Sequence, residues 1–93
     1  MSAIWPDLES PFMEAVRRSD ETHDGQPVFD VINRREKSVL AVVFWYRPWA
    51  RFCCRANSDQ VVFSDDCLDA LSAFCRALTK AARERAESVV NSE

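Results

Sequence analysis

Four cysteines and one histidine are the side chains of this sequence best suited to metal binding or nucleophilic attack. Cys53 and Cys54 are adjacent in a segment with strand character, so their side chains should point to opposite faces. Cys67 and Cys75 are eight positions apart, which is more than two turns of a helix. These spacings do not reproduce the paired C-x2-C arrangement of a zinc site. We therefore expect buried, reduced thiols, with no metal ion and no other cofactor.

The histidine and the acidic residues give no stronger indication of catalysis. His23 lies in the polar stretch DETHDG, and a nucleophile would need this imidazole as a base together with a third group to orient it. We expect His23 to be exposed in a loop and inert. Gly25 is the only glycine, which excludes a glycine-rich phosphate loop. Asp65 and Asp66 are typical of the first turn of a helix. The sequence therefore predicts a protein that is not an enzyme.

The length and net charge of the chain further limit the functional classes to which it could belong. The 93 residues, 47% hydrophobic and 29% charged, predict one folded domain spanning 1–93. A net charge of −3 argues against a general nucleic-acid binder, whose affinity depends on neutralising phosphates. The first residues lack the pattern of a signal peptide. The longest apolar run, Val39–Tyr46, is far shorter than the ~20 residues that span a bilayer. We expect a cytoplasmic protein without membrane contact.

The N-terminal part predicts an irregular lead-in over 1–9 and a short helix over 10–20. Ser10 suits the N-cap of that helix and Pro11 its first position. Phe12, Ala15 and Val16 would form its apolar stripe. The polar stretch SDETHDGQP that follows is typical of a loop.

Residues 27–63 predict an antiparallel sheet of three or four strands. PVFDVIN alternates, RREK has the character of a hairpin turn, and the run Val39–Tyr46 indicates a central strand covered on both faces. Pro48 cannot donate to a sheet ladder, so a turn is expected there before a strand over Trp49–Arg55. ANSD should form another turn, and QVVF a short last strand.

A long helix is predicted over 64–88. Ser64 suits its N-cap, and apolar residues then recur at helical spacing with Phe74 beside them: Leu68, Leu71, Cys75, Leu78 and Ala82. The order of short helix, antiparallel strands and long helix predicts an α+β two-layer domain, with the long helix on one face of the sheet.

The strand Trp49–Arg55 has two different faces. Phe52 and Cys54 should face the long helix, which leaves Arg51 and Arg55 on the opposite, outer face. The neighbouring strand is apolar on both sides, so its turn decides which side chains join the arginines. A two-residue turn would place there Leu40, Val42, Phe44 and Tyr46. A three-residue turn would instead place there Val39, Ala41, Val43 and Trp45. Either set is too apolar to leave bare.

Three covers for this outer face are open. The first is internal, with the N-terminal segment folding over it through Trp5, Leu8, Phe12 and Val16 while the arginines snorkel at its rim. The second is a protein surface, either another protein or a second copy in a homodimer, since interface centres are enriched in aromatic and arginine residues. The third is single-stranded nucleic acid, with bases on the aromatic rings and phosphates on the arginines.

We interpret the chain as a small non-catalytic protein-binding module, an inhibitor or adaptor that occupies a surface of a larger protein or complex. Compact proteins of this kind are encoded by phages and mobile elements, among them anti-CRISPR and other anti-defence proteins. Single-stranded nucleic-acid binding through the same face is the alternative. The expected partner-binding residues are Tyr46, Arg47, Trp49, Arg51 and Arg55, with the nearby loop residues Arg34, Arg35 and Lys37 as rim contacts.

Overall fold

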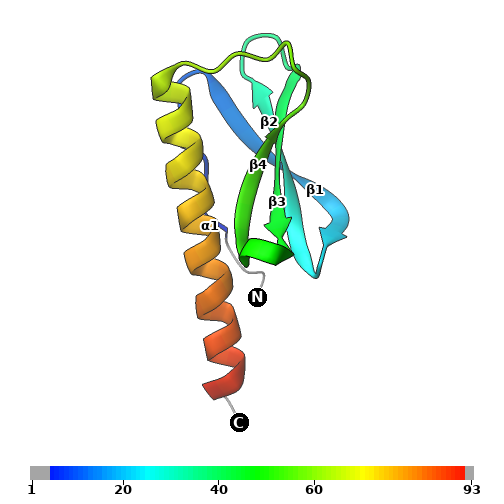
Figure 1. Cartoon of the computed structure of the whole chain (residues 1–93), viewed down its shortest axis with the longest axis vertical. Helices are drawn as coiled ribbons and strands as arrows, with labels where there is room; N and C mark the ends of the chain where they lie inside the picture. Colours follow the sequence, from blue (N-terminus) through cyan, green and yellow to red (C-terminus); the bar gives the residue numbers. More distant parts are fainter. Residues whose placement is uncertain (1–4, 92–93) are drawn as a thin grey trace.

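One antiparallel sheet and one long helix make up the fold in a computed structural model that describes residues 5–91, with side chains through residue 86 (Figure 1). The strands follow each other in the sheet in sequence order, so that β1 and β4 are the two edges. The predicted α+β class with a long C-terminal helix is confirmed. The elements are β1 Met13–His23, β2 Gln26–Asn33, β3 Val39–Tyr46, the 3-10 turn η1 Arg47–Trp49, β4 Arg51–Ala56 and α1 Asp65–Asn91.

The predicted N-terminal helix over 10–20 is wrong, because this segment enters the sheet as β1. Met13 pairs with Asn33 and Arg17 with Phe29 in an antiparallel ladder. A short helix would have buried only a three-residue stripe, whereas the strand pairs the edge of β2 that would otherwise stay open. Tertiary pairing therefore overrides the weak local preference for a helix.

Ser10 explains why the local signal was misleading. Its hydroxyl accepts hydrogen bonds from the backbone N–H of Phe12 at 3.1 Å and of Met13 at 3.2 Å. Serine hydroxyls form such bonds both at helix starts and in turns that lead to extended chain. The capping interaction is real, but the chain beyond it continues as a strand.

A tight hairpin turn replaces the predicted loop after residue 18. Asp24 and Gly25 both have positive φ, at 52° and 80°, as in the type I′ turns that favour Asp-Gly. The ladder between β1 and β2 resumes there, with His23 paired to Gln26. Between Arg17 and Thr22, β1 bulges away from its partner strand. The Asp-Gly pair was thus a readable hairpin signal.

The other two connections were predicted in the right places. In the turn over RREK, the Asn33 carboxamide oxygen accepts the N–H groups of Arg35 and Glu36, both at 2.9 Å. The turn at Pro48 is η1, after which Ala50 adopts a left-handed conformation. The predicted strand over 60–63 is wrong, since residues 57–64 form turns and irregular chain. The chain there crosses from the sheet to α1, and the free edge of β4 faces the helix instead of another strand.

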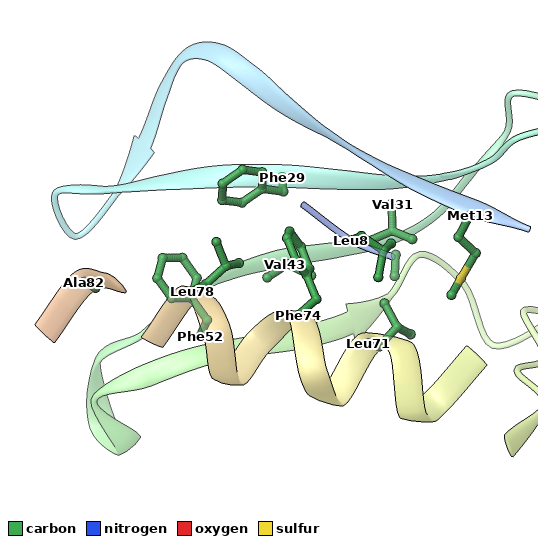
Figure 2. Close-up of a cluster of buried hydrophobic side chains, with 11 residues drawn as sticks. Leu8, Met13, Phe29, Val31, Val43, Phe52, Leu71, Phe74, Leu78 and Ala82 are labelled. Atoms are coloured by element: carbon green, nitrogen blue, oxygen red, sulfur yellow. The ribbon is translucent and has the colours of Figure 1, made fainter. Parts of the chain in front are cut away.

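Helix α1 covers the inner face of the sheet, and its last turns extend beyond the end of the strands (Figure 1). Ser64 caps it as predicted, since its hydroxyl accepts the N–H of Cys67 at 3.3 Å. The buried stripe is rotated from the expected one, because Leu68 is 54% exposed. The buried apolar residues of the helix, shown against the sheet in Figure 2, are Leu71, Phe74, Leu78 and Ala82.

The N-terminal segment completes the inner layer. Leu8 is buried between the sheet and α1 (Figure 2). The Trp5 ring lies edge-on to Phe29 at 6.5 Å and to Phe52 at 6.1 Å, and the Arg85 guanidinium stacks 3.7 Å from its centroid. Trp5 and Leu8 therefore pack on the helix side of the sheet. The first of the three covers considered for the outer face, the internal one, is therefore wrong for these two residues.

Candidate functional site

The face of the sheet opposite α1, called the outer face below, carries the candidate site. Its composition follows from the β3–β4 register, in which Val42 faces Arg55, Phe44 faces Cys53 and Tyr46 faces Arg51. The connection between these strands has four residues, an even number like the two-residue turn considered from the sequence. It therefore selects the set with Val42, Phe44 and Tyr46. Leu40 lies at a bulge and packs against the core instead.

Four rings form a continuous row on this face, which we call the aromatic row: His23, Phe44, Tyr46 and Trp49. Each neighbouring pair meets edge to face, with centroid separations of 5.5 Å for His23–Phe44, 6.3 Å for Phe44–Tyr46 and 4.9 Å for Tyr46–Trp49. Such contacts stabilise aromatic pairs by about 0.5–1.5 kcal/mol beyond the area they bury. The row ends at Trp49, whose side chain is 64% exposed.

Two arginines flank the aromatic row. The Arg55 guanidinium lies over the Phe44 ring, 5.4 Å from its centroid. Arg51 directs its Nε toward the carbonyl oxygen of Trp49 at 3.4 Å, a long hydrogen bond that leaves most of the side chain exposed. Cations stacked on rings and exposed aromatic surface are what the centres of protein interfaces use. Four of the expected residues, Tyr46, Trp49, Arg51 and Arg55, are thus brought together, and Arg47 is exposed in the same turn.

The predicted rim residues lie elsewhere. Arg34, Arg35 and Lys37 are in the β2–β3 turn, at the opposite end of the sheet from η1 (Figure 1). The eight residues of β3 separate the two ends by roughly 25 Å. Two of the three cations also form ion pairs with the Glu14 carboxylate. The Lys37 Nζ lies 3.0 Å and the Arg34 Nη1 3.7 Å from its oxygens. A partner seated on the aromatic row would have to cover the whole length of the face to reach them.

Part of the outer face is covered by β1. Arg18 donates from Nε and Nη2 to Asp30 Oδ1 at 3.0 and 2.8 Å and from Nη1 to Glu21 at 2.7 Å. These carboxylates raise the pKa of Arg18 further above its already high value. Val28, which points to the outer face of β2, is buried. The bulged end of β1 therefore folds across β2, and the open part of the face is the half formed by β3, β4 and η1.

Sequence reasoning missed two members of this site. His23 was expected to be inert in a loop, but it ends β1 and contacts Phe44 through its ring. Phe44 was considered for the outer face but was not included among the binding residues. The Asp-Gly turn that follows His23 was the signal that could have placed it at a strand end.

The cysteines are free thiols at different depths. Cys53 lies half-buried on the outer face, Cys54 is exposed at the inner side of β4, and Cys67 and Cys75 are half-buried on α1. The expectation of buried thiols is therefore wrong for Cys54, and the other three are only partly buried. Loss of solvent around the sulfur atoms raises the pKa of Cys53 and Cys54, although the Cys54 residue as a whole is exposed, and burial raises the pKa of Cys75 to about 12. Within the described residues, His, Cys, Asp and Glu do not come together in groups of three or more that could hold a metal ion.

The thiol of Cys75 should make stability depend on pH in the alkaline range. Its pKa is higher in the folded chain than the ordinary value of 9.0. The unfolded chain therefore releases this proton first, and the stabilisation is complete below pH 9 and is lost between pH 9 and about 12. Urea unfolding across this range should show a steeper loss for the wild type than for Cys75→Ala. The difference is at most about 1.4 kcal/mol per pH unit, and smaller because solvent screens a half-buried group. Parallel pH profiles would contradict this prediction.

Comparison with protein-family models, with curated proteins and with solved structures found no match for this chain. None of the helices in the described part of the chain has both the length and the apolarity needed to cross a membrane. Any function must therefore be argued from the surface itself.

Proposed function

We propose that this chain is a non-catalytic protein-binding module that uses the open half of its outer face. The observation that carries the proposal is the aromatic row with Arg51 and Arg55 beside it, ending at the 64% exposed ring of Trp49. A partner would bury these rings as anchors and offer carboxylates to the arginines. In this role the protein acts as an inhibitor or adaptor that occupies a surface of a larger protein, in the cytoplasm, as small proteins of phages and mobile elements do.

Two features favour a protein over single-stranded nucleic acid. The net charge of −3 repels a phosphate backbone. In addition, the Phe44 ring already has the Arg55 guanidinium over it and His23 against its edge. A base could therefore stack on it only by displacing the arginine. A second copy of the chain is an alternative protein partner for the same surface.

The double substitution Trp49→Ala with Arg55→Ala tests the proposal. Arg55 is chosen because it lies wholly on the outer face. We expect the dissociation constant for the partner to rise about 30-fold, or about 2 kcal/mol, since exposed aromatic and arginine anchors carry most of an interface's energy. The partner is first identified by affinity capture from the native host with mass spectrometry. Binding is then measured by calorimetry, or self-association by sedimentation.

A matched control removes an apolar and an arginine side chain away from the aromatic row. Arg35→Ala with Val62→Ala changes two exposed residues and should leave binding within about twofold, because surface positions without contacts contribute little. If the Trp49 and Arg55 variant binds the captured partner as tightly as the wild type does, the proposed surface is wrong.

Titration of a fluorescent single-stranded oligonucleotide distinguishes the alternative function, nucleic-acid binding, from protein binding. Titration at low and moderate salt should show no binding if the partner is a protein. Binding that weakens steeply with salt and is lost in the Trp49→Ala and Arg55→Ala variant would replace the proposal with the nucleic-acid reading.

A further inference from the structure

A second surface lies along the free edge of β4, where this strand faces α1. A groove of about 640 Å³ there is lined by β4 residues Arg51 and Phe52 and by one side of the helix from Ser72 to Glu84. A hollow of about 370 Å³ continues it toward the start of α1. Ser72 and Cys75 line both, so the two form one groove along the strand edge. We call it the edge groove.

The first half of the edge groove is basic. Arg76, Lys80 and Arg83 follow one another on α1 at spacings of four and three residues, which places them on one side of the helix. Arg51 faces them from β4, and Glu84 is the single carboxylate among the lining residues. Four cations against one anion contrast with the net charge of −3 for the whole chain. The local field therefore attracts an acidic ligand.

The second half of the edge groove is apolar. Phe63, Leu68 and Leu71 line it together with the β4 residues Cys54 and Ala56. Leu68 is 54% exposed although it belongs to the apolar stripe of the helix. An occupant with apolar side chains at this end would bury Leu68 and gain the usual stabilisation of removing such surface from water.

In the apolar half of the edge groove, the backbone of β4 has N–H and C=O groups available for hydrogen bonds to an occupant. The Phe52 N–H points away from β3 and donates to the Thr79 hydroxyl at 3.0 Å, whereas the Asn57 N–H points to β3 and donates to Leu40 at 2.8 Å. Backbone groups alternate in direction along a strand. The N–H and C=O groups of Cys54 and Ala56 therefore point outward like those of Phe52. Both residues are exposed, so this part of the edge is open to another strand.

We propose that the edge groove binds an extended peptide in which apolar residues precede acidic residues, added as a strand beside β4. Antiparallel addition, the pairing used throughout this sheet, places the first residues of the peptide beside Cys54 and Ala56. Its acidic residues then reach Arg51, Arg76 and Arg83. This is the β-augmentation mode of peptide recognition, with backbone bonds for affinity and side-chain contacts for specificity. Arg51 lines the edge groove and also flanks the aromatic row, so the two surfaces share this one side chain. The inference does not depend on the function proposed for the aromatic row.

A peptide fits the edge groove better than a nucleic-acid strand does. Single-strand binders combine cations with exposed rings on which bases stack. Here Phe52 is buried and Phe63 is half-buried, and neither offers an open face. The apolar half, moreover, has no cation among its lining residues to meet a phosphate.

The test uses a short fluorescein-labelled peptide in which valines precede glutamates, measured by fluorescence anisotropy at low salt. We expect saturable binding that weakens about tenfold in Arg76→Gln with Lys80→Gln, because two exposed ion pairs are lost. The control Arg35→Gln with Arg55→Gln removes two exposed arginines outside the groove and should bind within about twofold of the wild type. Amide hydrogen exchange should slow at Cys54 and Ala56 when the peptide binds.

Three results would overturn this inference: no saturable binding, equal binding of a scrambled peptide, or tighter binding of oligothymidine that the Arg76 and Lys80 substitutions abolish. The last result would assign the groove to a nucleic-acid strand. The Trp49→Ala and Arg55→Ala variant should bind the peptide normally, so failure of the outer-face function and failure of the edge groove can be told apart.

Discussion

Phe74→Ala is expected to lower the free energy of unfolding by about 3–5 kcal/mol, the usual cost of removing a buried aromatic side chain and leaving a cavity. Phe74 is 2% exposed and packs edge to face on Phe29 at 5.5 Å (Figure 2). A domain of this size has a total stability of roughly 5–14 kcal/mol. The variant should therefore lose a large part of its stability, which urea denaturation followed by circular dichroism will show.

Leu68→Ala is the matched control on the same helix. The helical spacing in the sequence assigns Leu68 to the buried stripe, but the structure leaves its side chain 54% exposed. We expect a cost below about 1 kcal/mol, as is usual for exposed positions. If Leu68→Ala destabilises the protein as much as Phe74→Ala does, the helix packs with a different face than the structure shows.

Met13→Ala should also be strongly destabilising, by about 2–5 kcal/mol. Met13 is 1% exposed and belongs to the main core, because β1 turns it toward α1 (Figure 2). In a helix starting at Ser10 with the stripe Phe12, Ala15 and Val16, Met13 would instead lie off the buried side. Thermal and urea unfolding of the variant therefore report on the conformation of this segment.

The neighbouring residue supplies the control for β1. Phe12 is 61% exposed, so Phe12→Ala should change the free energy of unfolding by about 0.5 kcal/mol or less. A strand predicts a larger loss of stability for Met13→Ala than for Phe12→Ala, whereas a helix over residues 10–20 predicts the reverse. A larger loss for Phe12→Ala than for Met13→Ala would restore the helical interpretation of residues 10–20.

Sequence reasoning succeeded where a local pattern was long or strongly constrained. The helix α1 was predicted to begin at Ser64 and does, because an N-cap serine, two acidic residues and a long apolar stripe all agree. The strand β3 was predicted from eight consecutive apolar residues. The turn at Pro48 followed from the missing N–H of proline. Each of these signals lies within a few residues of the chain.

Sequence reasoning failed where contacts with residues distant in the sequence decided the secondary structure of a segment. Residues 10–20 have only a weak helical stripe, and pairing with β2 outweighs it. The sequence QVVF has strand-forming residues, but the edge of β4 is oriented toward α1, and Thr79 takes the N–H of Phe52 there. Intrinsic preferences of about 1 kcal/mol or less are easily exceeded by such tertiary interactions.

For the candidate site too, the sequence predicted what depends on a local pattern and missed what depends on how the elements are connected. The alternation in Trp49–Arg55 was enough to place Arg51 and Arg55 on the face opposite the helix, because strand side chains alternate with a period of two. The sequence left open whether Phe44 or Trp45 would join them, since this depended on the length of the turn. The rim assignment of Arg34, Arg35 and Lys37 was an error of interpretation, because the RREK turn and the turn at Pro48 lie at opposite ends of the predicted strand Val39–Tyr46.

The sequence by itself determined the α+β class, the presence of the long helix and the two-faced character of β4, because each follows from periodicity within one segment. Only the tertiary structure decided the rest. It turned the N-terminal segment into β1 and sent Trp5 and Leu8 to the helix side. It also folded the end of β1 across β2, which leaves open the half of the outer face that carries the aromatic row. These outcomes depend on contacts between segments distant in sequence, whose energies no local pattern contains.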